Sequence, residues 1–254
     1  ASCLVGSEMC IRDRPISLRG DARAANMALA GNARPTLDAR QSQLIASMYR
    51  DTPLAQTVAE GFQVRDEVRR AMQAEMDAAS RNAMTSRGFE LVARRMAALM
   101  RERYDLGFVD VGGWDTHVGQ GATTGYLANR FEELGRGLAA FAQEMEPENW
   151  RQTVVVVISE FGRTFRENGN KGTDHGHGTV YWVLGGGLSA QAGGRVVGEQ
   201  QALTATTLFQ NRDYPVLNEY RAVLGGLFQR MYGLSPAQVA KVFDGVTPKD
   251  LQLV

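Results

Sequence analysis

The spacing of hydrophobic residues divides the chain into a helical first part and an α/β second part. Apolar positions recur every three or four residues over 36–49, 52–79 and 86–103, which predicts three amphipathic helices. Thr36 and Thr52 stand where N-caps are expected, and proline follows Thr52 at the first helical position. The methionines of these stretches fit helix packing better than a cofactor-binding role.

Short runs rich in β-branched and aromatic residues then replace the helical period. They cover 106–111, 153–158 and 179–184 and predict three strands. A helical pattern over 124–145 links the first two as a βαβ unit, whose right-handed crossover brings both strand ends to one sheet edge. The segment 159–178 has no helical period. Because a parallel return needs a crossover, usually helical, we expect the third strand to run antiparallel to the second.

The expected fold class is therefore α/β, with a mostly parallel sheet and one antiparallel strand. We expect residues 36–254 to form the C-terminal part of one domain, which is helical over 36–103 and α/β over 104–254, where the loops of the site lie. Residues 15–35 lack a clear period and are expected to form a loop lead-in. The other expected elements are two helices and a short edge strand, at 217–231, 235–243 and 195–197.

The first residues need a separate interpretation. Residues 3–14 resemble the in-frame translation of a transposon-type sequencing adapter, and a natural N-terminal strand is the alternative. On the adapter interpretation, residues 1–14 are excluded from the fold, and both cysteines, Cys3 and Cys10, are excluded with them. The fold is then expected to be truncated at its N-terminus, with further sequence upstream.

The charge balance argues against two classes of partner. Lys and Arg together number 28, and so do Asp and Glu, so the formal net charge is zero. A nucleic-acid-binding domain usually carries a basic patch, so no nucleic-acid partner is expected. No apolar run reaches the roughly 18 residues of a membrane span, so none is expected in this chain. Nothing in the sequence indicates an oligomeric state.

The three histidines of the chain all lie in two loops that follow predicted strands. Asp115 and His117 follow the first strand, while Asp174, His175 and His177 lie in the glycine-rich segment after the second. Imidazole with carboxylate is a ligand set for divalent metals, with zinc expected first and manganese, iron or calcium as alternatives. Alternate residues of an extended segment point the same way, so each pair can converge on one ion. The alternative is that each histidine caps a helix or bonds to backbone.

Four further polar residues surround this cluster in the sequence. Glu160 ends the second strand and is a candidate ligand or general base, or else an ion-pair partner of Arg163. Arg163 is a candidate catalytic group that stabilises an oxyanion. Arg166 and Lys171 are candidate substrate-binding residues, because their cationic groups suit phosphate or sulfate oxygens. The alternative for both is a solvated loop.

At these residues the sequence resembles the bacterial proteins of domain of unknown function 1501. The matching stretches are Gly-Gly-Trp-Asp-Thr-His at 112–117, Val-Ile-Ser-Glu-Phe-Gly-Arg-Thr at 157–164, Gly-Thr-Asp-His-Gly-His-Gly at 172–178 and Leu-Gly-Gly-Gly at 184–187. That family is grouped with the alkaline phosphatase and sulfatase superfamily. The resemblance implies an α/β/α sandwich of alkaline phosphatase-like type with a bimetal site.

The resemblance also implies roles for particular residues. Asp115 and His117 would correspond to the Asp and His of one metal, and His175 or His177 to a late histidine. Glu160 stands where the superfamily has an Asp-His pair. The superfamily's nucleophile and an early metal-binding Asp come from an N-terminal segment that has no match in this chain, consistent with truncation.

Two functions follow from the resemblance. The first is a metal-dependent hydrolase of phosphate or sulfate esters, with a small anionic ester as substrate. The second is a non-catalytic exported binding or assembly protein on the same fold, which the replacement of Asp-His by Glu160-Phe161 favours. Family members often carry a twin-arginine export signal, so a periplasmic or exported location is implied, although this chain shows no signal peptide.

Overall fold

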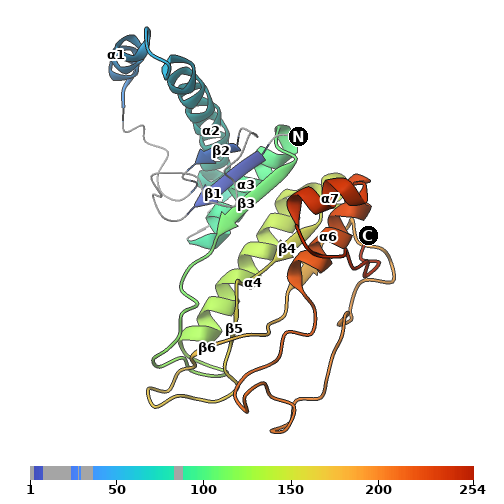
Figure 1. The fold of residues 1–254 in the computed structure, drawn as a ribbon. Coiled ribbons are helices and arrows are strands. Elements are labelled where there is room, and N and C mark those ends of the chain that lie inside the picture. Colours follow the sequence, from blue (N-terminus) through green and yellow to red (C-terminus); the bar gives the residue numbers. More distant parts are fainter. Residues whose placement is uncertain (1–2, 8–23, 28, 30–36, 83–87) are drawn as a thin grey trace. The chain divides into compact units, whose positions relative to one another are not determined.

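The computed structural model describes residues 3–7, 24–27, 29, 37–82 and 88–254 (Figure 1). The chain divides into two compact units. The first comprises Ala1–Gly113 and Arg130–Glu146, and the second comprises Trp114–Asn129 and Pro147–Val254. No helix among the described residues combines the length and the hydropathy that a membrane crossing requires.

The first unit contains a three-stranded parallel sheet and four helical segments. The sheet order is β2-β1-β3, and the strands are β1 (Cys3–Ser7), β2 (Ala24–Met27) and β3 (Leu106–Asp110). The helices are α1 (Ala39–Tyr49), α2 (Ala55–Asn82), α3 (Phe89–Glu102) and most of α4 (Tyr126–Glu144). The strand at 3–7 agrees with the alternative given above, a natural N-terminal strand. That residues 3–14 derive from a sequencing adapter stays a prediction.

The three helices expected over 36–103 are present, with different starts. Asp38 caps α1 in a capping box with Gln41, so the helix begins later than a cap at Thr36 would place it. Gly88 precedes α3 without a side-chain cap. The expected cap Thr36 and the expected start at Ser86 both lie outside the described residues.

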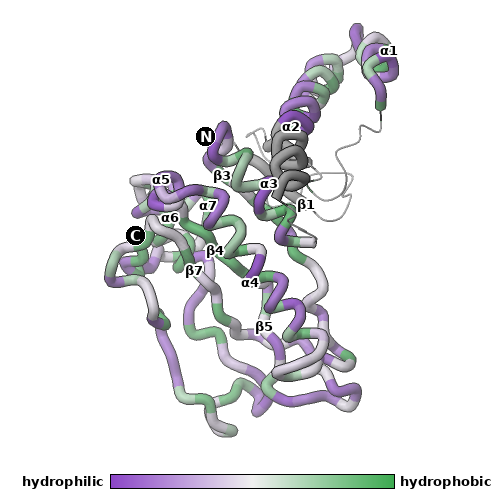
Figure 2. Tube along the Cα trace, turned by 180° about the vertical axis from the view of Figure 1, so that it is seen from behind, coloured by the Kyte–Doolittle hydropathy of each residue, from purple (hydrophilic) through white to green (hydrophobic). Residues whose placement is uncertain are grey.

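In the first unit α3 contacts α4, because the backbone nitrogen of Phe89 donates to Glu133 and the Phe89 ring lies close to Gly137. The buried face of α3 includes Phe89, Val92 and Met96, and that of α4 includes Leu134 and Phe141. Figure 2 shows hydrophobic and hydrophilic segments alternating along α4, as the period of an amphipathic helix requires.

The second unit contains two small antiparallel sheets, β4 (Val155–Val157) with β7 (Trp182–Leu184) and β5 (Gly162–Arg163) with β6 (His175–Gly176). Its helices are α5 (Glu146–Trp150), which begins one residue before the division, α6 (Tyr220–Tyr232) and α7 (Pro236–Val242). Val156 and Val183 pack against a core of Ala192, Leu227 and Leu253. The antiparallel pairing of β4 and β7 confirms the direction predicted for the third strand.

Three expectations about strands were wrong in detail. In the part of the chain that the structure describes, β3 pairs with β1 and β4 pairs with β7, so they do not share the predicted parallel sheet. Residues 195–197 form no strand, and Val197 packs against the apolar core of the second unit. The segment 159–178 contains the β5–β6 hairpin, which was not predicted. The alkaline phosphatase-like sandwich stays a prediction.

Candidate functional site

Two segments far apart in the sequence run side by side in the second unit, and most of the predicted metal ligands lie in them or next to them. Residues 116–120 precede α4, and residues 170–173 precede β6. Their backbones are joined by hydrogen bonds from Thr173 N to Thr116 O (3.1 Å), from Gly119 N to Asn170 O (3.0 Å) and from Gln120 N to Lys171 O (2.9 Å). This pairing, together with the β5–β6 hairpin, brings Asp115 and His117 toward His175.

Gly172 permits this close approach. A Cβ atom on Gly172 would lie 2.3 Å from the carbonyl carbon and oxygen of His117 and 2.4 Å from the carbonyl oxygen of Thr116. Both contacts are with backbone, which cannot move aside as a flexible side chain can. A side chain at residue 172 would therefore separate the two segments.

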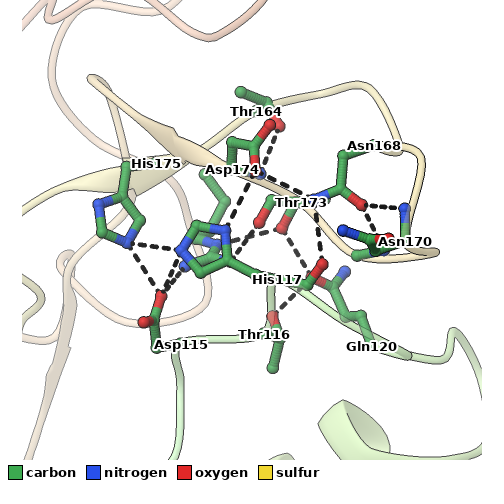
Figure 3. Close-up of polar contacts among 12 residues, drawn as sticks. Asp115, Thr116, His117, Gln120, Thr164, Asn168, Asn170, Thr173, Asp174 and His175 are labelled. Atoms are coloured by element: carbon green, nitrogen blue, oxygen red, sulfur yellow. Dashed lines mark hydrogen bonds and ion pairs between the residues drawn. The ribbon is translucent and has the colours of Figure 1, made fainter.

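Three potential ligand atoms converge at one point of this surface (Figure 3). Nε2 of His117 and Nε2 of His175 each lie 2.9 Å from Oδ1 of Asp115, and the two nitrogens are 3.1 Å apart. Ligands of a tetrahedral zinc ion at about 2.0–2.2 Å lie roughly 3.3 Å from one another. The triangle of Asp115, His117 and His175 is therefore close to the size that one cation requires. We call these three residues the ligand triangle.

The hydrogen-bonding pattern of His117 is satisfied either by a second ring proton or by a cation. Nδ1 of His117 lies 3.1 Å from Oδ1 of Asp174, and because an ionised carboxylate only accepts, Nδ1 must donate. In a neutral ring Nε2 then carries a lone pair, which faces the carboxylate oxygen of Asp115. Two electron-rich atoms 2.9 Å apart repel each other unless a second ring proton or a cation lies between them.

Asp115 is held in its ionised form. Hydrogen bonds from His175, which has the larger effect, and from Arg163 lower the pKa of the Asp115 carboxyl to about 2. Arg163 donates from Nη1 to Asp115 at 2.8 Å and from Nε to the Thr173 hydroxyl at 3.1 Å. The structure therefore gives Arg163, predicted as a catalytic group, a contact that fixes Asp115.

Asp174, predicted as a ligand, lies behind His117 rather than in the ligand triangle. Its carboxylate accepts from His117 Nδ1 and, at 3.0 Å, from Nδ2 of Asn168. These hydrogen bonds lower the pKa of the Asp174 carboxyl, and the one from Asn168 has the larger effect. Metal-binding histidines usually donate their second ring nitrogen to a carboxylate in this way. The arrangement fits Asp174 as the residue that orients His117.

His177, the other predicted ligand, faces Asp213 instead. Nδ1 and the backbone nitrogen of His177 both lie 2.6 Å from Oδ2 of Asp213, which is completely buried. The His177 ring also packs on the Phe209 ring in a T-shaped arrangement, with ring centroids 4.8 Å apart. His177 is therefore engaged away from the ligand triangle.

Glu160 does not join the triangle either. Its carboxylate lies 3.5 Å from the hydroxyl of Ser159, and it is exposed. Within the described ranges, the group of converging ligand atoms contains only residues 115, 117 and 175. The neighbouring Phe161 does reach the site, because its ring centroid lies 4.3 Å from that of His175.

A cavity of about 250 Å³ lies along the loop that ends at Thr173, and it is lined by both predicted substrate-binding residues, Arg166 and Lys171. Arg166 is fixed by Asn211, whose backbone and side-chain oxygens accept at 2.9 and 2.7 Å. Glu167 also lines the cavity, so the charged lining side chains carry one net positive charge. The remaining lining residues are Gln120, Gly121, Thr164, Phe165, Gly172 and Thr173.

Three residues of this region were not predicted from the sequence. Asn168 and Gln120 join the two segments: Gln120 Oε1 accepts from the hydroxyls of Thr116 at 2.6 Å and Thr173 at 2.7 Å. Asp213 holds His177. Asn168 is followed by glycine, a pairing typical of a turn closed by the asparagine side chain, and that signal could have identified it. An isolated aspartate such as Asp213 gives no such signal.

Comparison with known proteins places the chain in a family but gives no activity. A family model described as "Protein of unknown function (DUF1501)" matches residues 10–243. No curated protein matches the chain, and no solved structure does. The family resemblance is therefore confirmed, while its wider grouping with phosphatases and sulfatases stays a prediction.

Proposed function

This chain belongs to the DUF1501 family, whose description assigns no function, and we propose from its own site that it is a metal-dependent hydrolase of a small anionic ester. The ester is a phosphate or a sulfate ester. The expected cofactor is a divalent cation, with zinc first and manganese, iron or calcium as alternatives.

One observation carries this proposal: the ligand triangle. Its side chains come from two segments distant in the sequence, with Asp115 and His175 60 positions apart, and their ligand atoms lie within 3.1 Å of one another. These side chains are at least 39% exposed, so an ion and a substrate can reach them. Imidazole nitrogen and carboxylate oxygen are the ligand types that zinc takes in catalytic sites, which also leave a position open for water or substrate.

The residues around the triangle fit the handling of an anion. A bound cation would polarise the ester and lower the pKa of an attacking nucleophile. Lys171 and Arg166 line the cavity and would hold the anionic group. Arg163 and Asp174 keep Asp115 and His117 in place. Within this scheme Glu160 has no role that its position supports.

The first test is metal content. The protein is loaded with zinc, dialysed, and its zinc measured by mass spectrometry, beside the variants Asp115→Ala and His175→Ala. We expect about one zinc ion per wild-type chain and a large loss in both variants. His177→Gln is the matched control, because it changes the one histidine outside the triangle, and it should retain zinc. Unchanged zinc in both alanine variants would remove the proposal.

A second function has one observation in its favour. Glu160, which follows β4, lies outside the triangle. Among the described residues, no carboxylate at the end of β4 therefore supplies the triangle with a general base. This favours a non-catalytic binding or assembly protein that has kept the metal site, and for it a periplasmic or exported location is also proposed. Screening the zinc-loaded protein against phosphate and sulfate esters separates the two functions. Metal binding without any turnover would support the binding protein.

A further inference from the structure

We propose that Asn168 is a positioning residue that couples the cavity to the ligand triangle, so that a small anion and the divalent cation bind cooperatively. The inference rests on the proposed function, because it assumes that the triangle binds a cation. It assigns to Asn168 a task that neither the sequence pattern nor the family description indicates.

One end of the Asn168 side chain serves the triangle. Its Nδ2 donates to the Asp174 carboxylate and to the backbone oxygen of His117, both at 3.0 Å. Asp174 in turn accepts from Nδ1 of His117. Asn168 therefore holds both the main chain of His117 and the carboxylate that orients its ring.

The other end of the same side chain serves the cavity. Its Oδ1 accepts from the backbone nitrogens of Asn170 at 2.9 Å and Gly172 at 3.0 Å, the residues on either side of Lys171 (Figure 3). Lys171 has a φ of 58°, a left-handed conformation that is strained for a non-glycine residue. The two hydrogen bonds to Asn168 hold the loop in the shape that keeps Lys171 in the cavity lining.

Among side chains of the length of asparagine, only an amide both donates and accepts in this way. Aspartate offers acceptors but no donor, and alanine offers neither. A cation that orders His117 and Asp174 should therefore also order the 168–172 loop. An anion held by Lys171 orders that loop first and should in turn order His117 and Asp174. Coupling between two binding equilibria is reciprocal, so each ligand should tighten the other by the same factor.

The test separates the two ends of Asn168. Zinc affinity is measured by competition with a chelator, and inorganic phosphate affinity by calorimetry on metal-free and zinc-loaded protein. Asn168→Ala removes both sets of hydrogen bonds, whereas Asn168→Asp keeps the acceptors and loses the donors. Asn170→Asp is the matched control, since it adds the same charge in the same loop and leaves the backbone hydrogen bonds of residue 170 in place.

We expect Asn168→Asp to weaken zinc binding by about 10–100-fold relative to Asn170→Asp. Its phosphate affinity in the metal-free protein should match that control. Asn168→Ala should weaken both ligands and reduce the factor by which zinc tightens phosphate. In an Asp174→Asn background, Asn168→Ala should cost much less zinc affinity, because Asn168 acts largely through Asp174.

Two results would overturn the inference in distinguishable ways. If the wild type binds zinc and Asp115→Ala does not, but both Asn168 variants match the control in zinc affinity, then the metal site stands and the coupling is wrong. If the wild type binds no zinc, the proposed function and this inference fail together. Unfolding midpoints of all variants verify that affinity changes do not arise from global unfolding.

Discussion

At the scale of single residues, two carboxylate–histidine pairs with the same chemistry lie in different surroundings. Asp174 is 56% exposed and holds His117 toward the triangle, whereas Asp213 is completely buried and holds His177. Asp213 also accepts from Arg212 at 3.1 Å and pairs with Thr164 across a β-bridge. The first pair fits the orientation of a ligand. The second fastens the 209–214 segment to the β5–β6 hairpin.

Replacing Asp213 by asparagine should destabilise the second unit. Oδ2 accepts from His177 and Oδ1 accepts from Arg212, so one of these donors would face the amide group of the asparagine. An unsatisfied buried hydrogen-bonding group costs about 1–3 kcal/mol. Urea denaturation should show a loss of this size. Asp250→Asn, at a half-exposed carboxylate, is the control and should change stability by less than about 0.5 kcal/mol.

The same variant carries a pH signature. Burial raises the pKa of Asp213, but hydrogen bonds from the ring and backbone of His177 and from Arg212 outweigh it and leave the pKa below its ordinary value of 3.8. A lowered pKa in the folded state means that the carboxylate stabilises the protein above 3.8, and that this contribution is lost as the pH falls through the folded-state pKa. The stability difference between wild type and Asp213→Asn should therefore shrink below pH 3.8. A constant difference would contradict this account.

At the scale of elements, the packing of α3 on α4 depends on a glycine inside a helix. Gly137 is buried, and a Cβ there would lie 2.2 Å from the Phe89 ring, so Gly137→Ala should destabilise the protein by about 1–3 kcal/mol through overpacking. Gly135 lies on the exposed side of the same helix, where a Cβ would meet no atom within 4 Å. Gly135→Ala should stabilise by about 0.5–1 kcal/mol. Urea denaturation of the two variants should give opposite signs, and equal signs would show that α3 and α4 do not pack this way.

The elements also show what local patterns can predict. The helices at 52–79 and 124–145 were found because a long amphipathic period is unambiguous, and the helix expected at 235–243 is present as α7. The β5–β6 hairpin was missed because two-residue strands have no period to detect. The prediction that the first two strands share one sheet was wrong, because strand–helix–strand order does not determine which strands pair.

At the scale of the whole molecule, long-range convergence was predictable and side-chain direction was not. The clustering of all three histidines after strands indicated a common site, and the antiparallel return of β7 indicated which loops meet. Because side chains alternate along an extended segment, the sequence predicted that His175 and His177 point the same way. The buried Asp213, 36 residues after His177, instead holds the His177 ring away from the ligand triangle. Such a choice depends on a residue with no local signal.

The most direct measurement is a zinc anomalous difference map from crystals of the protein grown with zinc. The account predicts a peak about 2.0–2.2 Å from Nε2 of His117, Nε2 of His175 and a carboxylate oxygen of Asp115, with Asp174 still bonded to Nδ1 of His117. The ligand triangle would be contradicted by a map without a peak there, or with zinc bound only at other residues.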